Sequence, residues 1–255
     1  MATHAAVGAP QPKVLLNHRL PAPLPPFAAA VAALLDLNAV TRSVGPGQEI
    51  VSEGRRCSSA FLITEGIAIR YRILRDGQRQ ILKFVLPGDF VGVRSCFFES
   101  ALYSTKTLTD AAIAVVPLAR LIDLFDSHPG LAAKMLRLFA REAAADAERL
   151  ILLGRRPARD RIAHFLLELL VRLQTVGLAD ERSYRLPLTQ EMIGDSLGLS
   201  IPYVNRVLHQ LRDDGLVRIK DHVVIIDDIE ELSAIADFED SYLRPLSIAD
   251  MTEPE

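Results

Sequence analysis

The sequence predicts an α+β protein with an N-terminal β jelly-roll barrel, a long helix and a C-terminal winged helix-turn-helix. Three observations lead to this prediction. Short β-prone runs cut by Gly, Pro and Asp fill residues 39–117, residues 131–153 contain no Pro or Gly, and two short helical patterns on either side of Gly198-Leu199 precede a hairpin pattern. The 255 residues, 49% of them hydrophobic, suffice for two cores.

Composition excludes several classes of protein. A formal net charge of −3 and 24% charged residues are ordinary for a globular chain, so collagen-like, wholly disordered and disulfide-scaffold proteins are excluded. No run of about 18 apolar residues occurs, and we therefore expect no membrane span. Two cysteines without a secretory signal pattern favour a reducing cytoplasm.

The N-terminal half is predicted to hold an arm and a barrel. Residues 1–25 are rich in Ala and Pro, which pack poorly, so we expect a flexible arm there. A barrel domain over 26–130 follows and begins with a short helix over 27–37. Partial alternation over 67–73 predicts a strand, and Asp76-Gly77 predicts the tight turn of a hairpin.

The pattern becomes helical after residue 117. A short helix over 118–125 precedes a long one over 131–153, about 34 Å long at about 1.5 Å per residue. Two apolar stripes recur every seven residues on the long helix. One consists of Leu131, Leu138, Ala145 and Leu152, and the other of Leu136, Ala143 and Leu150. A barrel covers one stripe, so we expect the second to pair in a parallel homodimer through residues 131–154; the alternative is a single well-buried helix.

A break is predicted at Gly154-Arg155-Arg156-Pro157, which we expect to be the hinge between the domains. An amphipathic helix over 158–174 follows, in a C-terminal domain that spans 155–240. The acidic segment from residue 227 is expected to form a closing helix and then an acidic tail over 241–255.

Residues 186–226 carry the most specific pattern. Thr189 is expected to cap a helix that ends near Leu197, and Ser200 to cap a second helix over 201–213. This spacing is typical of a helix-turn-helix, whose second helix enters the major groove of DNA. Strands over 215–219 and 222–226, joined at Lys220-Asp221, are predicted to form the wing.

The second helix of this pair offers side chains suited to base edges. Arg206 can donate two hydrogen bonds to O6 and N7 of guanine, and Asn205 can pair with adenine. We expect His209, one turn later, to contact phosphate or base, and Tyr203 to lie exposed beside it. Ser200, Thr189 and Gln190 are predicted to contact phosphates.

The charge balance predicts only modest non-specific binding to DNA. Residues 155–255 contain 12 basic and 19 acidic residues, and residues 186–220 contain four of each. Because DNA-binding domains usually carry a basic surface, the positive groups are expected to be concentrated locally. The alternative for Arg206 is a surface ion pair with Asp213 or Asp214.

In this order and spacing, the motifs resemble those of the Crp/Fnr family of bacterial transcription regulators over residues 39–235. The resemblance rests on VGPGQEIVSEGRRCSSAFLITEGIAIRYRILRDGQRQILKFVLPGDFVG and LPLTQEMIGDSLGLSIPYVNRVLHQLRDDGLVRI. It implies a cyclic-nucleotide-binding-like sensor barrel, a dimerisation helix that relays the signal, a two-fold-related double-stranded DNA site and RNA polymerase as a partner. It implies no enzyme activity.

The chain departs from the family pattern at the ligand and at the recognition helix. Members that bind cyclic AMP use a Gly-Glu pair for the ribose and an Arg for the phosphate, but Val93 and Tyr103 stand at or near the Glu and Arg positions. Neither residue can make those contacts, so we expect no cyclic AMP binding. The alternative is a cyclic-nucleotide-responsive regulator with a non-standard pocket, in which Arg94 substitutes. Pro202 and Asn205 replace the family's Glu and Ser or Gly, so the half-site is expected to differ.

No cofactor or metal is expected. Iron–sulfur members use four cysteines and this chain has two, and residues 39–117 contain no His or Met to ligate haem. Cys57 and Cys96 are expected to be small buried fillers, with redox sensing as the alternative. All six histidines lie outside residues 39–117, so a metal-dependent cupin-type enzyme is not supported, and no Gly-x-Ser-x-Gly motif indicates a hydrolase.

Overall fold

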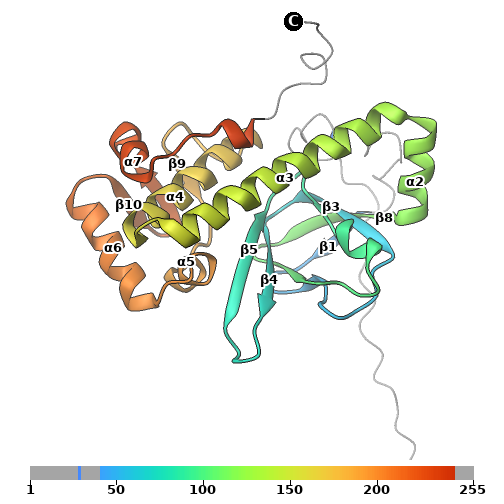
Figure 1. Ribbon diagram of the computed structural model, residues 1–255, viewed down its shortest axis with the longest axis horizontal. Helices are drawn as coiled ribbons and strands as arrows, with labels where there is room; N and C mark the ends of the chain where they lie inside the picture. The colour runs from blue at the N-terminus through green and yellow to red at the C-terminus, as the bar shows by residue number, and fades with distance from the viewer. Residues whose placement is uncertain (1–27, 30–40, 245–255) are drawn as a thin grey trace, which may run out of the picture.

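Strands β1 to β8 of the N-terminal domain form two four-stranded antiparallel sheets, in the orders β1-β8-β3-β6 and β2-β7-β4-β5. The computed structural model describes residues 28–29 and 41–244 (Figure 1), so the arm over 1–25, most of the helix expected over 27–37 and residues 245–255 lie outside the described part. Apolar side chains of both sheets, such as Ile63 and Val85, share one core. The predicted jelly-roll architecture is confirmed. The strands are β1 Thr41–Val44, β2 Glu49–Val51, β3 Ser59–Glu65, β4 Ala68–Ile73, β5 Arg79–Val85, β6 Phe90–Val91, β7 Ser104–Thr107 and β8 Ala111–Pro117.

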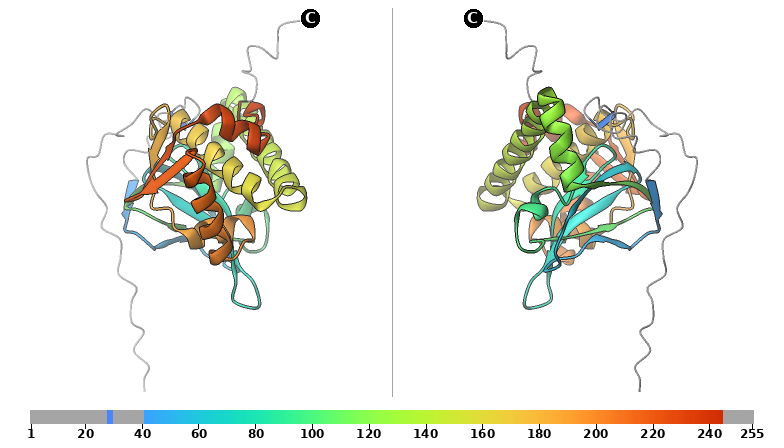
Figure 2. Two further views of the ribbon diagram at one scale, coloured as in Figure 1. Left: turned by 90° about the vertical axis from the view of Figure 1, so that its left-hand side faces the viewer. Right: turned by 90° about the vertical axis from the view of Figure 1, so that its right-hand side faces the viewer.

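The predicted hairpin is the β4–β5 pair, and it projects from the barrel (Figure 2). Ile73 pairs with Arg79 at its end. Gly77 has a φ of +85°, and the Asp76 carboxylate accepts a hydrogen bond from the Gln78 backbone N–H, so the Asp-Gly pair forms the turn as expected. A short 3-10 helix, η2 (Arg94–Phe97), follows β6 on the other sheet.

Helix α3 (Pro129–Arg155) follows α2 (Leu118–Ser127) and crosses the barrel toward the C-terminal domain (Figure 1). The break predicted at Gly154-Arg155-Arg156-Pro157 is confirmed, although Gly154 itself still lies inside the helix. A glycine there costs about 1 kcal/mol, which is not enough to stop a helix. Pro157 is the residue that ends it, since the residue before a proline avoids helical geometry; Arg156 has a ψ of 144°.

The C-terminal domain packs around α4 (Ala158–Thr175), whose side chains Ile162, Leu166 and Leu169 are almost fully buried. Its other elements are β9 Ser183–Arg185, α5 Gln190–Leu197, α6 Ile201–Asp213, β10 Val217–Lys220, β11 Val223–Ile226, α7 Ile229–Ala236 and η3 Ser241–Leu243. β10 and β11 form the wing, and β9, which we did not predict, extends it in the order β10-β11-β9. The segment expected to be an acidic tail therefore begins with the ordered turn η3.

The wing turn lies one residue later than predicted. Lys220 pairs with Val223 at the end of the strands, and the turn residues are Asp221 and His222, with φ of 51° and 64°. Two successive left-handed residues match the twist of a two-residue hairpin, and Asp tolerates this geometry better than Lys. Within the described residues, none of the helices combines the length and the apolarity that crossing a lipid bilayer needs.

Candidate nucleic-acid interface

Helices α5 and α6 are joined by a tight turn that depends on two glycines. Gly198 has a φ of +64° at the end of α5. A Cβ on Gly194 would lie 2.5 Å from the carbonyl oxygen of Leu199, so only glycine permits this approach of the turn to α5. No role was predicted for Gly194, although a glycine inside an otherwise helical pattern is a signal of close packing.

The two predicted helix caps have different outcomes. Thr189 caps α5 as expected, because its hydroxyl oxygen accepts a hydrogen bond from the Met192 backbone N–H at 3.1 Å. The predicted side-chain cap at Ser200 is wrong: Ser200 is the residue before α6, but its hydroxyl makes no capping hydrogen bond. Pro202 has no N–H to donate, and the Tyr203 N–H donates to the Ser200 carbonyl instead.

The outer face of α6 carries the predicted base-contacting side chains. Val204, Val207 and Leu211 are buried, which leaves Tyr203, Arg206 and His209 exposed on the opposite face. The Arg206 guanidinium lies 5.5 Å from the centre of the Tyr203 ring, a cation–π contact that restrains the arginine on the open surface.

Asn205 lies at the edge of this face and is partly buried. Its amide donates a hydrogen bond to the Gln190 side-chain oxygen at 3.2 Å, and so links α6 to the first turn of α5. Both side chains line a hollow of about 160 Å³ between these helices and the wing, together with His209, Arg212 and Ile219. The structure thus brings Asn205, Gln190 and His209 together, with Thr189 and Ser200 exposed at the starts of the two helices.

Acidic neighbours neutralise several of the basic residues in this domain. Asp213 pairs with Arg212 and Asp214 with Arg159, so the alternative ion pair for Arg206 is absent. On the wing, Arg218 donates two hydrogen bonds to Asp227, which raise the pKa of Arg218 and hold the pKa of Asp227 below its ordinary value. Among the described residues, Arg206 and Lys220 form no ion pair.

The long helix α3 leaves one of its two stripes uncovered. Leu131 and Leu152 of the first stripe are buried, whereas Leu136 and Leu150 of the second are 69% and 73% exposed. Small residues extend the exposed stripe, and together with Leu136 and Leu150 they follow one another at alternating intervals of three and four residues. They are Ala133, Ala140, Ala143, Ala147 and Gly154.

Comparisons with known proteins agree with this architecture. The sequence model of the cyclic nucleotide-binding domain matches residues 41–128, and that of the Crp-like helix-turn-helix domain matches residues 160–235. The chain is 30% identical over 195 residues to the transcriptional activator protein anr of Pseudomonas aeruginosa, with 76% of this chain and 80% of that protein covered. The chain belongs to the Crp/Fnr family of DNA-binding transcription regulators.

Two further relatives extend this comparison. The Crp/Fnr chain described here is 28% identical to the fumarate and nitrate reduction regulatory protein of Salmonella typhimurium, with 76% of this chain and 78% of that protein covered. Its fold is similar to that of FixK2 from Bradyrhizobium japonicum, with a TM-score of 0.70, 28% identity, and 77% of this chain and 96% of that chain covered.

A pocket of this Crp/Fnr barrel contains a carboxylate from the long helix α3. Glu142 of α3 accepts hydrogen bonds from Lys83 and Arg94, each at 2.6 Å. Burial alone would raise the pKa of the Glu142 carboxyl, but the charges of Lys83 and Arg70 outweigh it and lower that pKa below its ordinary value. The pocket, about 40 Å³ in volume, is also lined by Val93 and Tyr103, the positions where the family pattern is lost.

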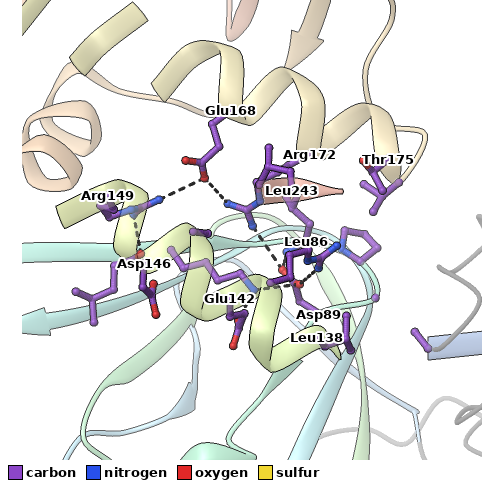
Figure 3. Close-up of a pocket in the computed structure, with 18 residues that line it drawn as sticks. Leu86, Asp89, Leu138, Glu142, Asp146, Arg149, Glu168, Arg172, Thr175 and Leu243 are labelled. Carbon is purple, nitrogen blue, oxygen red and sulfur yellow. Dashed lines mark hydrogen bonds and ion pairs between the residues drawn. The ribbon is translucent and has the colours of Figure 1, made fainter. Parts of the chain in front are cut away.

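A second group of charges joins the barrel to α3 and α4 (Figure 3). Asp89, at the start of β6, faces Lys83 at 3.1 Å and Arg172 at 3.7 Å, and these charges lower its pKa although burial opposes them. Glu168 of α4 bridges Arg149 and Arg172, both at 3.4 Å. No group of three or more His, Cys, Asp or Glu in the described part of the chain is arranged to hold a metal ion.

The barrel also contacts the helix-turn-helix directly. Arg79, at the start of β5, binds Asp195 of α5 at 2.6 Å and lies 3.7 Å from Glu191. The Gln80 amide donates to the Ser196 carbonyl at 3.3 Å. The β4–β5 hairpin is therefore joined to α5 by an ion pair and a hydrogen bond.

Proposed function

We propose that this Crp/Fnr regulator acts in the cytoplasm as a parallel homodimer on a two-fold-related DNA site, and that it catalyses no reaction. The proposal of a dimer rests on the exposed stripe of α3. An apolar seam at alternating spacings of three and four is the pattern of a helix that packs against a second helix. The alanines permit close approach, while Leu136 and Leu150 supply apolar contact.

The DNA contacts follow from the exposed face of α6. Placed in the major groove, Arg206 donates to guanine, and Asn205, oriented by Gln190, reads the neighbouring base. His209 and Tyr203 flank Arg206, and Thr189, Gln190 and Ser200 lie at helix starts suited to phosphate. A parallel dimer presents two such helices, which fits half-sites about 34 Å apart. RNA polymerase is a further partner, because relatives such as anr are named transcriptional activators.

The barrel works without cyclic AMP in this proposal. A cyclic phosphate at the pocket would have to displace the Glu142 carboxylate from Lys83 and Arg94, and no side chain there matches the ribose-binding Glu of the family. The alternative, a non-standard pocket that uses Arg94, requires this residue to leave both Glu142 and Asp146. Signals reach the DNA through the contacts of the barrel with α3 and α5, as a shift between two dimer arrangements.

Genome-wide mapping of DNA bound by the purified protein, with and without cell metabolites, tests this function. We expect a motif with two-fold symmetry. Enrichment of asymmetric sites, or no enrichment at low salt, would contradict the proposal.

Replacement of Arg206 by Ala should weaken binding to the mapped site by about 1–3 kcal/mol, because the bidentate contact to guanine is lost. Non-specific binding should change little, since it depends on phosphate contacts. Titration of labelled specific and scrambled duplexes measures both affinities. Arg120→Ala is the matched control, because Arg120 is exposed on α2, outside the interface. Equal losses on both duplexes would refute the base-contact role.

Titration with cyclic AMP should give no heat above that of buffer. The pocket is occupied by Glu142 and lacks the ribose contact, so the nucleotide gains no compensating hydrogen bonds. Isothermal calorimetry on the full chain measures this. Saturable binding at micromolar concentration would instead favour the non-standard pocket.

A further inference from the structure

The two cysteines of the chain lie in contact beside the paired strands β3 and β6. Cys57 precedes β3 and Cys96 lies in η2, yet their sulfur atoms are 3.9 Å apart. The Cys57 thiol also donates to the Ser59 carbonyl at 3.2 Å. A side chain at Gly92 would place its Cβ 3.2 Å from the Cys57 sulfur, so the glycine makes room for the pair. Cys57 and Cys96 were expected to be small buried fillers, with redox sensing as the alternative, but neither residue is fully buried.

Both cysteine residues are only partly buried, and Cys57 lies at a hollow of the surface. It lines a hollow of about 250 Å³ together with Arg55, Arg56 and Ser58. Burial, followed by the neighbouring Cys57, raises the pKa of Cys96 to about 12, so Cys96 stays protonated at neutral pH. Because Cys57 lines the hollow and Cys96 does not, a reagent that enters the hollow reaches Cys57 first.

We propose that Cys57 and Cys96 form a peroxide-oxidisable dithiol site whose disulfide moves η2 and loosens its hold on α3. The Cys57 thiol loses its proton and its sulfur attacks hydrogen peroxide; the O–O bond breaks, and the departing hydroxide takes up that proton, so a sulfenic acid and water result. The Cys96 sulfur then attacks the Cys57 sulfur, an S–S bond forms, and the hydroxyl leaves as water with the Cys96 proton. In total, two thiols and one peroxide give one disulfide and two waters.

The 3-10 helix η2, which contains Cys96, also contains the residue that binds α3. Arg94 is two residues before Cys96 in η2 and binds Glu142 at 2.6 Å and Asp146 at 3.6 Å. Its guanidinium also lies 5.8 Å from the centre of the Phe139 ring. A disulfide requires the sulfurs to approach from 3.9 Å to about 2.0 Å. This approach draws η2 toward Cys57, and Arg94 moves with it.

Oxidation of the reduced full-length protein with hydrogen peroxide tests the site. Intact mass should fall by two hydrogen atoms per chain, non-reducing peptide mapping should give a Cys57–Cys96 crosslink, and dithiothreitol should reverse both. Cys57→Ser should give no disulfide. Cys96→Ser should stop at a sulfenic acid that dimedone traps on Cys57.

Hydrogen exchange of the backbone amides measures whether formation of the disulfide loosens the contact between η2 and α3. The oxidised protein should exchange faster than the reduced one over residues 94–97 and 139–146, and oxidised Cys57→Ser should match its reduced form. Arg94→Ala should still form the disulfide but lose the change over 139–146. An unchanged mass, or crosslinks between chains only, would overturn the dithiol site. A disulfide without altered exchange over 139–146 would overturn the coupling to α3.

Discussion

Replacement of Leu150 by Glu should convert the proposed homodimer into a monomer. Leu150 is 73% exposed in the single chain and lies near the end of the exposed stripe of α3. A parallel two-fold seam places both copies of this residue side by side, so the substitution removes two buried leucines and brings two carboxylates together. The lost apolar burial alone amounts to about 3–6 kcal/mol for the two copies, which weakens dimerisation by about 10²–10⁴-fold.

Sedimentation equilibrium over a range of concentrations measures this dissociation. Ile122→Glu is the matched control, because Ile122 is 46% exposed but lies on α2, away from the stripe. It should leave the dimer intact. The Leu150→Glu monomer should also lose affinity for the mapped DNA site, since the second half-site contact becomes intermolecular. If the Leu150→Glu protein still sediments as a dimer, the dimer forms through a surface other than the exposed stripe of α3.

Local patterns in the sequence were sufficient to predict the elements that present the candidate DNA interface. The helix predicted over 201–213 has the bounds of α6, and Thr189 caps α5 as its position suggests. The two heptad stripes of α3 were also visible, because a helix repeats its faces at fixed spacing. These features depend on residues that are close in the sequence, within about two turns of a helix.

Features that depend on distant pairing were not predictable in the same way. β9 has only three residues and exists because it pairs with β11, some forty positions later. The contact between Cys57 and Cys96 likewise depends on how β3 and β6 pair. The prediction that the pocket binds no cyclic AMP rested on Val93 and Tyr103, which cannot contact the ribose and the phosphate. The side chain that lies in the pocket, Glu142, comes from the helix that was predicted to mediate dimerisation. A single sequence carries no signal for such a contact.

Replacement of Glu142 by Gln should destabilise the protein by about 3 kcal/mol at pH 7, the lower end of the cost of removing one partner from a buried ion pair. The lower end applies because Lys83 keeps Asp89 at 3.1 Å, and Arg94, whose side chain is 41% exposed, keeps Asp146. Chemical denaturation at fixed protein concentration measures the change, since the free energy of unfolding of a dimer depends on concentration. Glu99→Gln, a carboxylate on the exposed surface after η2, should change it little.

The pH dependence separates a charge effect from a packing effect. The folded protein holds the pKa of Glu142 below its ordinary value, so its contribution to stability is complete above about pH 4.3 and is lost as the pH falls through the lowered pKa. The gap between wild type and Glu142→Gln should therefore be widest near neutral pH and should narrow below pH 4. Asp89 also pairs with Lys83, and its negative charge opposes the lowering of the Glu142 pKa, so the acid dependence of the difference includes the response of Asp89 to the loss of the Glu142 charge. A gap that stays constant across this range would mean that Glu142 contributes by filling space, and the carboxylate would then not be what holds Lys83 and Arg94 in the pocket.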